Sequence, residues 1–425
     1  MMLDCYDKYV QILKEELVPA MGCTEPIAIA YGTAYARDVL KEKANRIEVL
    51  ASGNMIKNTK CVIVPNTGNL VGIEASAVIG LLAGDSNKEL EVISVVNDES
   101  IKETAELLKT DFCKVDLLDT TNVLHFIIKL FGDNHSCEVE ITNAHTHIQK
   151  VVLDGNTIYE DNETDKYLGK FTDRSCLNID DIYEFANTCN LDDVRDLITR
   201  QIECNIAIAE EGMNGQYGIG IGQCIFNEYT NDIISKVKAY TAAASEARMS
   251  GCCLPVVTNS GSGNQGITCS VPLIIYARNF NYSEEKLLRT LVFSNLTAIH
   301  QKTSIGRLSA FCGAVSAACA AGAGFTYLKN GNLEQIKDTI TNTLADIPGI
   351  VCDGAKATCA AKIATSLDAA IMSHQMAMQN KVYDGHMGIL KHDIENTIQS
   401  IGRIGKYGMK STDKEILEIM LDKER

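Results

Sequence analysis

Hydrophobic and polar positions follow two different rhythms along the chain, and each rhythm predicts one kind of element. Residues 4–18 and 26–43 carry apolar side chains at helical spacing, with Pro26 in a first turn, where proline is tolerated. From residue 45 to about residue 160, short β-branched runs bounded by Gly, Asn and Asp predict strands. These runs are RIEVLASGN, TKCVIVPNTG, LEVISVVND, CKVDLLD, LHFIIKLFG, SCEVEITNAHTHI and KVVLDGNTI, with helices expected between them at 72–84 and 98–110.

Helical spacing returns after about residue 178 and continues through the rest of the chain. The expected helices cover 179–245, 283–301, 303–328, 333–346, 353–379 and 391–403. Many are rich in Ala and apolar on nearly every face, as helices inside a bundle are. The sequence therefore predicts an α+β protein. Residues 1–43 and 179–425 form a large, mainly helical domain containing both termini and the catalytic site, and residues 44–178 form an inserted α/β domain that covers the active site.

Composition limits the class of protein. The chain has 425 residues, of which 46% are hydrophobic and 22% charged, as in a folded globular protein and unlike a disordered one. Uncharged apolar runs of about 18 residues and a basic leader with an apolar core are both missing, so we expect neither a membrane span nor a signal peptide. The net charge of -16 argues against nucleic acid or an anionic membrane as the partner. We expect a cytoplasmic protein with a small-molecule substrate, and self-association stays open.

The chain has 16 cysteines, which is many for a protein without an export signal. In a reducing compartment most will be small buried hydrophobes, and a few are expected to bind metal or do chemistry. Cys23 in MGCTEP precedes a helix, Cys312 lies in a small-residue segment, and Cys352 in GIVCDGAKATC lies at a loop–helix boundary. Their spacing excludes zinc-ribbon and ferredoxin patterns. What remains is either inert core thiols or a [4Fe–4S] site of three distant cysteines, with one iron free to act as a Lewis acid.

A turn rich in Gly, Ser and Asn, TNSGSGNQG, is the second candidate site. Its backbone N–H groups can form a nest for an anion such as an amino-acid carboxylate. The candidate residues are Ser260, Gly261, Ser262, Gly263 and Asn264. A plain flexible loop is one alternative. A carboxylate cradle of the kind found in pyridoxal-phosphate dehydratases is another.

Polar residues of the α/β domain form the third group. Asn54 and Lys57 in SGNMIKN, and Asn66 and Thr67 in VPNTG, are expected at the ends of two strands, where substrate contacts are common. Ordinary turn chemistry is the alternative.

The general base that removes a substrate proton is not fixed by the sequence, and its candidates are Lys57, His145, Lys302 and a serine able to form an alkoxide. His145 and His147 alternate in NAHTHI and would share one face of a strand, although a metal site there would need a third ligand that is not nearby.

The segments MGCTEPIAIAYG, SGNMIKN, VPNTG, IGRLSAFCGA and GIVCDGAKATCAAKIAT resemble the iron–sulfur L-cysteine desulfidase family, which is related to the α-chain of bacterial iron–sulfur L-serine dehydratases. The resemblance implies that Cys23, Cys312 and Cys352 hold a [4Fe–4S] cluster, with Cys319 and Cys359 as the nearest alternatives. It also implies an oxygen-sensitive lyase that converts L-cysteine to pyruvate, ammonia and hydrogen sulfide. An iron–sulfur L-serine dehydratase, a pyridoxal-phosphate lyase and a non-catalytic iron–sulfur sensor stay open.

Overall fold

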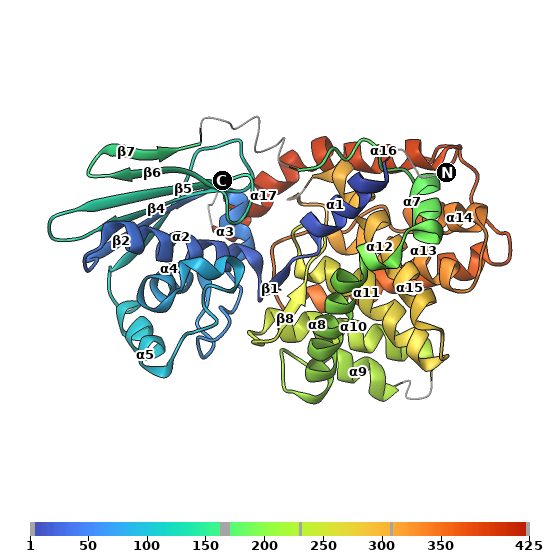
Figure 1. Ribbon diagram of the computed structural model, residues 1–425, viewed down its shortest axis with the longest axis horizontal. Helices are drawn as coiled ribbons and strands as arrows, with labels where there is room; N and C mark the ends of the chain where they lie inside the picture. Colours follow the sequence, from blue (N-terminus) through green and yellow to red (C-terminus); the bar gives the residue numbers. More distant parts are fainter. Residues whose placement is uncertain (1–4, 162–170, 229–231, 307–308, 422–425) are drawn as a thin grey trace.

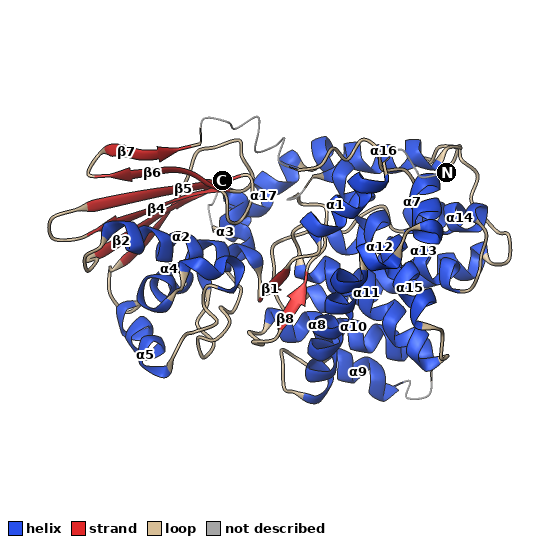
Figure 2. Ribbon diagram, viewed as in Figure 1, coloured by secondary structure: helices blue, strands red, loops and turns tan. Residues whose placement is uncertain are grey.

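The structure is a computed structural model that describes residues 5–161, 171–228, 232–306 and 309–421. Two parts lie side by side along the long axis, a sheet with helices and a larger assembly of helices (Figure 1). Nearly all strands belong to the first part (Figure 2). This architecture confirms the α+β class. Among the described residues, no helix is both long enough and apolar enough to span a membrane.

The α/β domain is built on a six-stranded sheet in the order β3-β2-β4-β5-β6-β7, in which β2 and β3 are parallel and the other pairs antiparallel. Its strands are β2 (Arg46–Ala51), β3 (Cys113–Leu117), β4 (His125–Phe131), β5 (Ser136–Thr142), β6 (Ile148–Leu153) and β7 (Asn156–Glu160). Alternation along β4 turns Phe126, Ile128 and Leu130 to the buried face, as a period of two requires. The helices of this domain are α2 (Thr24–Leu40), α3 (Gly53–Thr59), α4 (Gly72–Ala83), the 3-10 helix η1 (Ser86–Glu91) and α5 (Asp98–Leu107).

Helix α2 packs on the sheet and on α4, not inside the helical domain. A Cβ on Gly32 would lie 3.2 Å from Phe126, and one on Gly80 would lie 2.3 Å from the carbonyl oxygen of Ala30, so both contacts are close. The expected domain boundary after residue 43 therefore differs from the packing, which places the junction near Cys23. Because α2 is apolar on almost every side, its sequence could not show which core it joins.

The helical domain surrounds one large apolar core to which α1 and most later helices contribute. Helix α13 lies at its centre and packs against α11, α12, α14 and α15. The elements are α1 (Tyr6–Glu16), α7 (Ile179–Thr188), η2 (Leu191–Asp193), α8 (Arg195–Asn214), α9 (Ile221–Glu228), α10 (Ile233–Met249), α11 (Gly263–Asn279), α12 (Glu284–Ile305), α13 (Gly313–Leu328), α14 (Leu333–Asp346), α15 (Cys359–Ala377), α16 (Ile394–Arg403), η3 (Ile404–Gly408) and α17 (Lys410–Met420).

Among the described residues, two of the connections between the domains lie near the ends of the chain. Strand β1 (Pro19–Met21) pairs antiparallel with β8 (Pro255–Val257), so two short strands lie outside the range expected from the sequence. At the other end of the chain, α17 packs on α3, and its Asp413 binds the buried ammonium group of Lys57. The first connection delivers the chain to Cys23 and the second fixes α3 beside the helical domain.

Three expected strand features are absent from the described part of the α/β domain. TKCVIVPNTG forms a helix end and a turn with one isolated bridge between Ile63 and Val71. LEVISVVND forms the end of η1 and a turn, because Val92 and Ile93 are buried in the same core as α2 without joining the sheet. SGNMIKN forms helix α3 where a strand end was expected.

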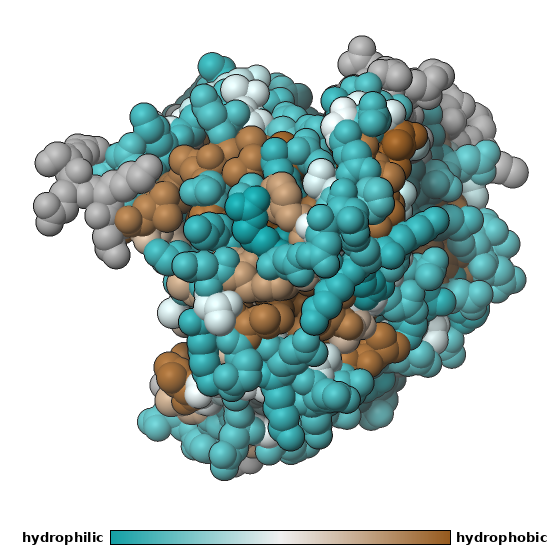
Figure 3. Space-filling model, turned by 90° about the vertical axis from the view of Figure 1, so that its left-hand side faces the viewer, coloured by the Kyte–Doolittle hydropathy of each residue, from teal (hydrophilic) through white to brown (hydrophobic). Residues whose placement is uncertain are grey.

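The free end of the α/β domain is mainly hydrophilic, and its apolar residues form separate patches (Figure 3). Exposed apolar side chains of this domain include Val95, Leu117 and Ile158.

Candidate functional site

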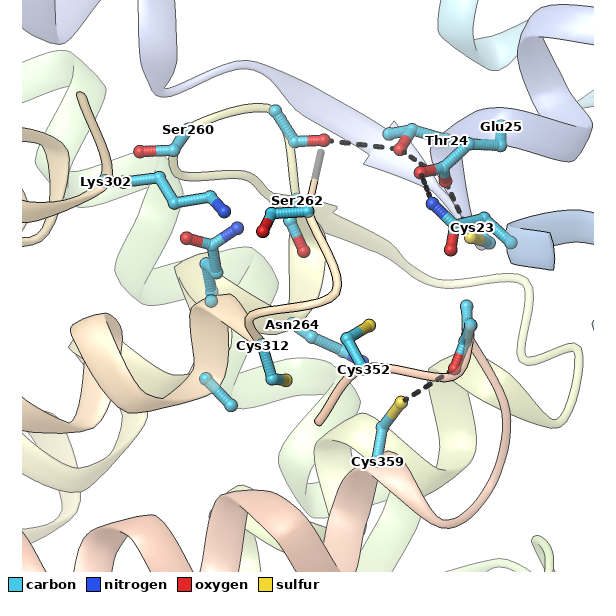
Figure 4. A pocket seen from close by; sticks show the side chains of 18 of the residues that line it. Cys23, Thr24, Glu25, Ser260, Ser262, Asn264, Lys302, Cys312, Cys352 and Cys359 are labelled. Carbon is cyan, nitrogen blue, oxygen red and sulfur yellow. Dashed lines mark hydrogen bonds between the residues drawn. The ribbon is translucent and has the colours of Figure 1, made fainter. Parts of the chain in front are cut away.

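A cavity of about 110 Å³ lies at the junction of the two domains, with room for a small molecule. It brings together Cys23, Cys312 and Cys352, which are separated by nearly the whole chain (Figure 4). The turn at Ser260 and the side chain of Lys302 also line it. The sequence-predicted cysteines and the predicted carboxylate turn therefore face the same space.

Cys23 is held at the junction by the two glycine-containing turns around it. It is the N-cap residue of α2, and its Sγ donates to Glu25 Oε2 at 3.0 Å. The preceding Gly22 has φ 57° and lies so close to Pro65 that a Cβ would sit 2.1 Å from the proline ring. The VPNTG turn therefore fixes the backbone next to Cys23, which explains why both motifs occur in one sequence.

Cys312 and Cys352 are neighbours because their two loops pair with each other. Phe311 and Val351 form an antiparallel bridge. On either side of it, Cys312 N–H donates to the carbonyl of Ile350 at 2.9 Å and Cys352 N–H donates to the carbonyl of Ala310 at 2.7 Å. A distant pair of cysteines is thereby placed side by side by backbone hydrogen bonds.

The two thiols share a hydrogen bond that separates their acidities. Cys352 accepts this hydrogen bond from the Cys312 thiol, which lowers the pKa of Cys352. The charges of Lys57 and Lys362 lower that pKa further, and together these effects outweigh burial. Cys312 donates the hydrogen bond, and this role and its burial both raise the pKa of Cys312. Cys352 is therefore the thiol of this pair that ionises first.

The two alternative cysteines have different surroundings. Cys319 is fully buried in α13, where its Sγ faces the carbonyl of Ile340 at 4.0 Å, and it does not line the cavity. Cys359 begins α15 and does line the cavity, next to Cys23. The structure thus separates Cys312 from Cys319 clearly, whereas Cys352 and Cys359 both face the same space.

A backbone pattern distinguishes Cys352 from Cys359. The sulfurs of Cys23, Cys312 and Cys352 each accept a hydrogen bond from the backbone N–H two residues later, in Glu25, Ala314 and Gly354. The sulfur of Cys359 instead accepts from the backbone of Lys356, three residues earlier. Hydrogen bonds from N–H groups to thiolate sulfur are among the features that tune iron–sulfur sites.

Four helices begin at the cavity without a side-chain cap. Their N-cap residues are Cys23 for α2, Ser262 for α11, Cys312 for α13 and Thr358 for α15. Asn, Asp or Ser side chains cap α5, α7, α10, α12, α14 and α16, whereas α1, α4, α8 and α17 are also without a side-chain cap, so a missing cap is not peculiar to the cavity. These first turns direct backbone N–H groups and positive helix-dipole ends at the cavity, and those of Glu25 and Ala314 bond the sulfurs of Cys23 and Cys312, so the cavity favours anions and thiolates.

The turn at residues 260–264 reverses the chain tightly beside the cavity. Ser260 and Gly261 both have positive φ, 51° and 76°. Asn259 and Ser262 close the turn with two backbone hydrogen bonds of 3.1 and 3.0 Å. Thr24 Oγ1 donates to the carbonyl of Gly261 at 3.2 Å and so ties the turn to α2. Of the five predicted residues, Gly263 does not line the cavity and the other four do.

The candidate bases fall into two groups. His145 and Lys302 line the cavity, and Lys302 extends beside Ser260 and Ser262 (Figure 4). Lys57 lies behind Cys352, in a neighbouring cavity, with its ammonium bound to Asp413. His145 and His147 lie in a turn after β5, so they do not share a strand face.

His147 has a separate, structural environment. Its Nδ1 lies 2.9 Å from the Thr142 carbonyl and its Nε2 3.1 Å from Asp161.

The remaining predicted contacts lie away from the cavity. Asn54 lines the neighbouring cavity beside Lys57. Asn66 Nδ2 donates to the carbonyl of Ile93, and Thr67 Oγ1 donates to the carbonyl of Val64. The Thr67 bond is ordinary turn chemistry, and the Asn66 bond ties the VPNTG turn to the segment after η1.

Two charged residues of the cavity were missed from the sequence. Glu25 is buried, and burial alone would raise its pKa, but the charge of His145 and hydrogen bonds from neighbours, Cys23 among them, bring that pKa below its usual value. Asn58 Nδ2 also donates to its Oε1 at 3.0 Å. Arg248 is 2% exposed near the end of α10, in an alanine-rich segment. Its only sequence signal is a charge in an otherwise small-residue helix.

Within the described ranges, no three His, Cys, Asp or Glu side chains converge in the way that a single metal ion requires. The cavity thus presents thiols, anion-binding helix ends and a buried guanidinium, a combination typical of an enzyme site for a small anionic or zwitterionic molecule.

Comparisons with known proteins agree with this class. A family model described as the serine dehydratase alpha chain matches residues 87–418. A UPF0597 protein of Lachnoclostridium phytofermentans is 48% identical over 417 residues, covering 98% of this chain and 100% of the relative. A UPF0597 protein of Treponema denticola is 50% identical over 424 residues, covering 98% of both. The chain belongs to the serine dehydratase alpha chain family, and this assignment indicates a lyase acting on a small molecule.

Proposed function

We propose that the protein is an L-cysteine desulfidase, which converts L-cysteine and water to pyruvate, ammonia and hydrogen sulfide. The observation that carries the proposal is the meeting of Cys23, Cys312 and Cys352 with the Ser260 turn around one cavity. Elimination of sulfide needs a carboxylate site, a base for the α-proton and a partner for the leaving thiolate. The cavity offers residues for the carboxylate site and for the base. It also offers thiols suited to hold a metal group, which would be the partner of the leaving thiolate.

The donor set fits a [4Fe–4S] cluster held by Cys23, Cys312 and Cys352. A single ion needs its donors to converge on one point, which the described side chains do not do. A cubane instead spreads its thiolates over separate irons. Burial and the neighbouring Glu25 carboxylate raise the pKa of the Cys23 thiol, whereas the charge of Arg248 and the backbone N–H of Glu25 act in the opposite direction and favour its thiolate. When bound, a cluster with one iron free of protein ligands supplies a soft Lewis acid for a leaving sulfur.

The chain's own residues perform the remaining work. The turn at residues 260–264 and the first turn of α11 bind the α-carboxylate and so orient the amino acid. His145 or Lys302 removes the α-proton, since both line the cavity. The β-carbon–sulfur bond then breaks to give aminoacrylate, which hydrolyses to pyruvate and ammonia.

An L-serine dehydratase is the second candidate, because the matching family model carries that name. The site would be the same, with hydroxide as the leaving group. A soft metal centre favours sulfur over oxygen as a ligand, which is why cysteine is preferred here.

The test is anaerobic purification, reconstitution with iron and sulfide, and assay of pyruvate and sulfide from L-cysteine and of pyruvate from L-serine. The proposal predicts a higher kcat/KM for L-cysteine. Faster turnover of L-serine would assign the second candidate. Activity that depends on added pyridoxal phosphate without iron would assign a pyridoxal lyase, and bound iron without pyruvate from either substrate would indicate a sensor.

A further inference from the structure

Arg248 is a buried cation whose hydrogen-bonding capacity is not filled by the protein. Its side chain lines the cavity and is 2% exposed. Its Nη1 donates to Asn264 Oδ1 at 3.2 Å, whereas its Nε is buried and has no acceptor among the described residues. A buried polar group without a partner is costly, and a charged one more so.

The surroundings of Arg248 increase that cost. The guanidinium rests against the first turn of α11, so closely that a Cβ on Gly263 would lie 2.3 Å from Nε. That turn carries the positive end of the helix dipole, which repels a cation. An anion in the cavity within reach of both the guanidinium and this turn would therefore be stabilised by both.

The protein offers Arg248 little compensation. Glu25 is the carboxylate that interacts with it, but Glu25 Oε1 already accepts from Asn58, and Glu25 Oε2 accepts from Cys23 and Thr24. The Cys23 thiol also interacts with the guanidinium. The guanidinium of this cavity-lining residue therefore keeps hydrogen-bonding capacity that the protein does not fill and that a guest anion can use.

We propose that Arg248 is a specificity-determining residue that binds the α-carboxylate of the substrate, beside the turn at residues 260–264. The α-carboxylate is the group of a small neutral amino acid that is anionic at neutral pH, and a guanidinium matches it in charge and shape. Arg248 thus restricts the substrate class to amino acids with a free α-carboxylate. This inference rests on the proposed function and refines it.

The inference is tested on the cluster-free protein, so that binding is measured apart from turnover. The probes are L-alanine and L-alaninamide, which share a side chain and differ in the carboxylate, and the dissociation constants are measured by ligand-observed NMR. Wild-type protein should bind L-alanine at least about tenfold more tightly than the amide, as expected for one charged hydrogen bond. Arg248→Gln should weaken L-alanine binding by a similar factor and remove the discrimination, and Arg248→Lys should fall between.

Arg195→Gln is the matched control, because Arg195 forms exposed ion pairs with Asp192 and Glu284, and it should change nothing. Circular dichroism and thermal melting check folding, and Arg248→Lys replaces the glutamine variant if that one unfolds. Three results would overturn the inference. Wild-type protein could bind L-alanine and L-alaninamide equally, it could fail to bind L-alanine, or Arg248→Gln could leave the dissociation constant of L-alanine unchanged. Slower alkylation of Cys23 in Arg248→Gln, with unchanged L-alanine binding, would make Arg248 a counterion of that thiol instead.

Failure of the proposed function looks different. Carboxylate discrimination that depends on Arg248, without pyruvate from cysteine or serine, would retain the inference and remove the desulfidase. Pyruvate formation from L-cysteine by Arg248→Gln at an unchanged KM would retain the desulfidase and remove the inference about Arg248.

Discussion

Lys57 and Asp413 form a buried ion pair whose removal should have unequal effects from its two sides. The Lys57 side chain is 2% exposed and the Asp413 side chain 18%. Asp413→Leu leaves an ammonium buried without an anion, and we expect it to lower the free energy of unfolding by about 3 kcal/mol, the lower end for a broken buried pair. Lys57→Met leaves a carboxylate that still reaches solvent and accepts from Ala310 N–H, so we expect a loss of about 1 kcal/mol.

The double variant Lys57→Met/Asp413→Leu replaces the pair by apolar groups and should recover much of the loss, with a coupling energy of about 2 kcal/mol. Urea denaturation of the cluster-free protein gives the three free energies. The same variants separate a structural Lys57 from a catalytic one. If Lys57 only joins α3 to α17, the reconstituted double variant keeps its activity.

Two results would refute this reasoning. Equal losses in both single variants, or losses below about 0.5 kcal/mol in each, would show that the pair is not buried in solution. If the double variant folds and holds iron but forms no pyruvate, Lys57 is needed for catalysis and is again a candidate for the general base.

The other predictions concern pH and oxygen. Burial first, and then the charge of Lys329, lowers the pKa of His374 to about 4 from its ordinary 6.5. The unfolded chain therefore takes up the proton first, and stability falls by roughly 3 kcal/mol as pH drops from 6.5 to 4. His374→Gln should flatten the dependence of the urea midpoint on pH in that range, and parallel curves for both proteins would contradict it. Activity should fall in air and return with iron, sulfide and a reductant, whereas full activity of an iron-free protein handled in air would exclude the cluster.

The sequence indicated which residues to consider for the site, but not how the fold would bring them together. Cys23, Cys312 and Cys352 were identifiable because each lies beside glycine or at the start of a helix, and the structure brings all three to one cavity. Their meeting depends on the pairing of β1 with β8 and on the bridge between Phe311 and Val351. Such long-range pairings leave no local pattern that a sequence could show.

The missed features have a common physical reason. Arg248 and Glu25 take their importance from what surrounds them in space, not from neighbours in sequence. Val92 and Ile93 form an apolar run typical of a strand, but they are buried beside α2 without pairing with another strand. Hydrophobic runs reveal burial, whereas the choice between strand and turn depends on available partners.

The central claim is that Cys23, Cys312 and Cys352 hold a [4Fe–4S] cluster, and the iron and acid-labile sulfide content of anaerobically reconstituted variants tests it most directly. Alanine variants of these three should lose most of the iron. Cys319→Ala and Cys359→Ala should keep about four irons per chain. Cys319→Ala costs only on the order of 1 kcal/mol of packing. Iron loss in Cys359→Ala with iron retained in Cys352→Ala would reassign that ligand, and full iron in all five variants would contradict the account.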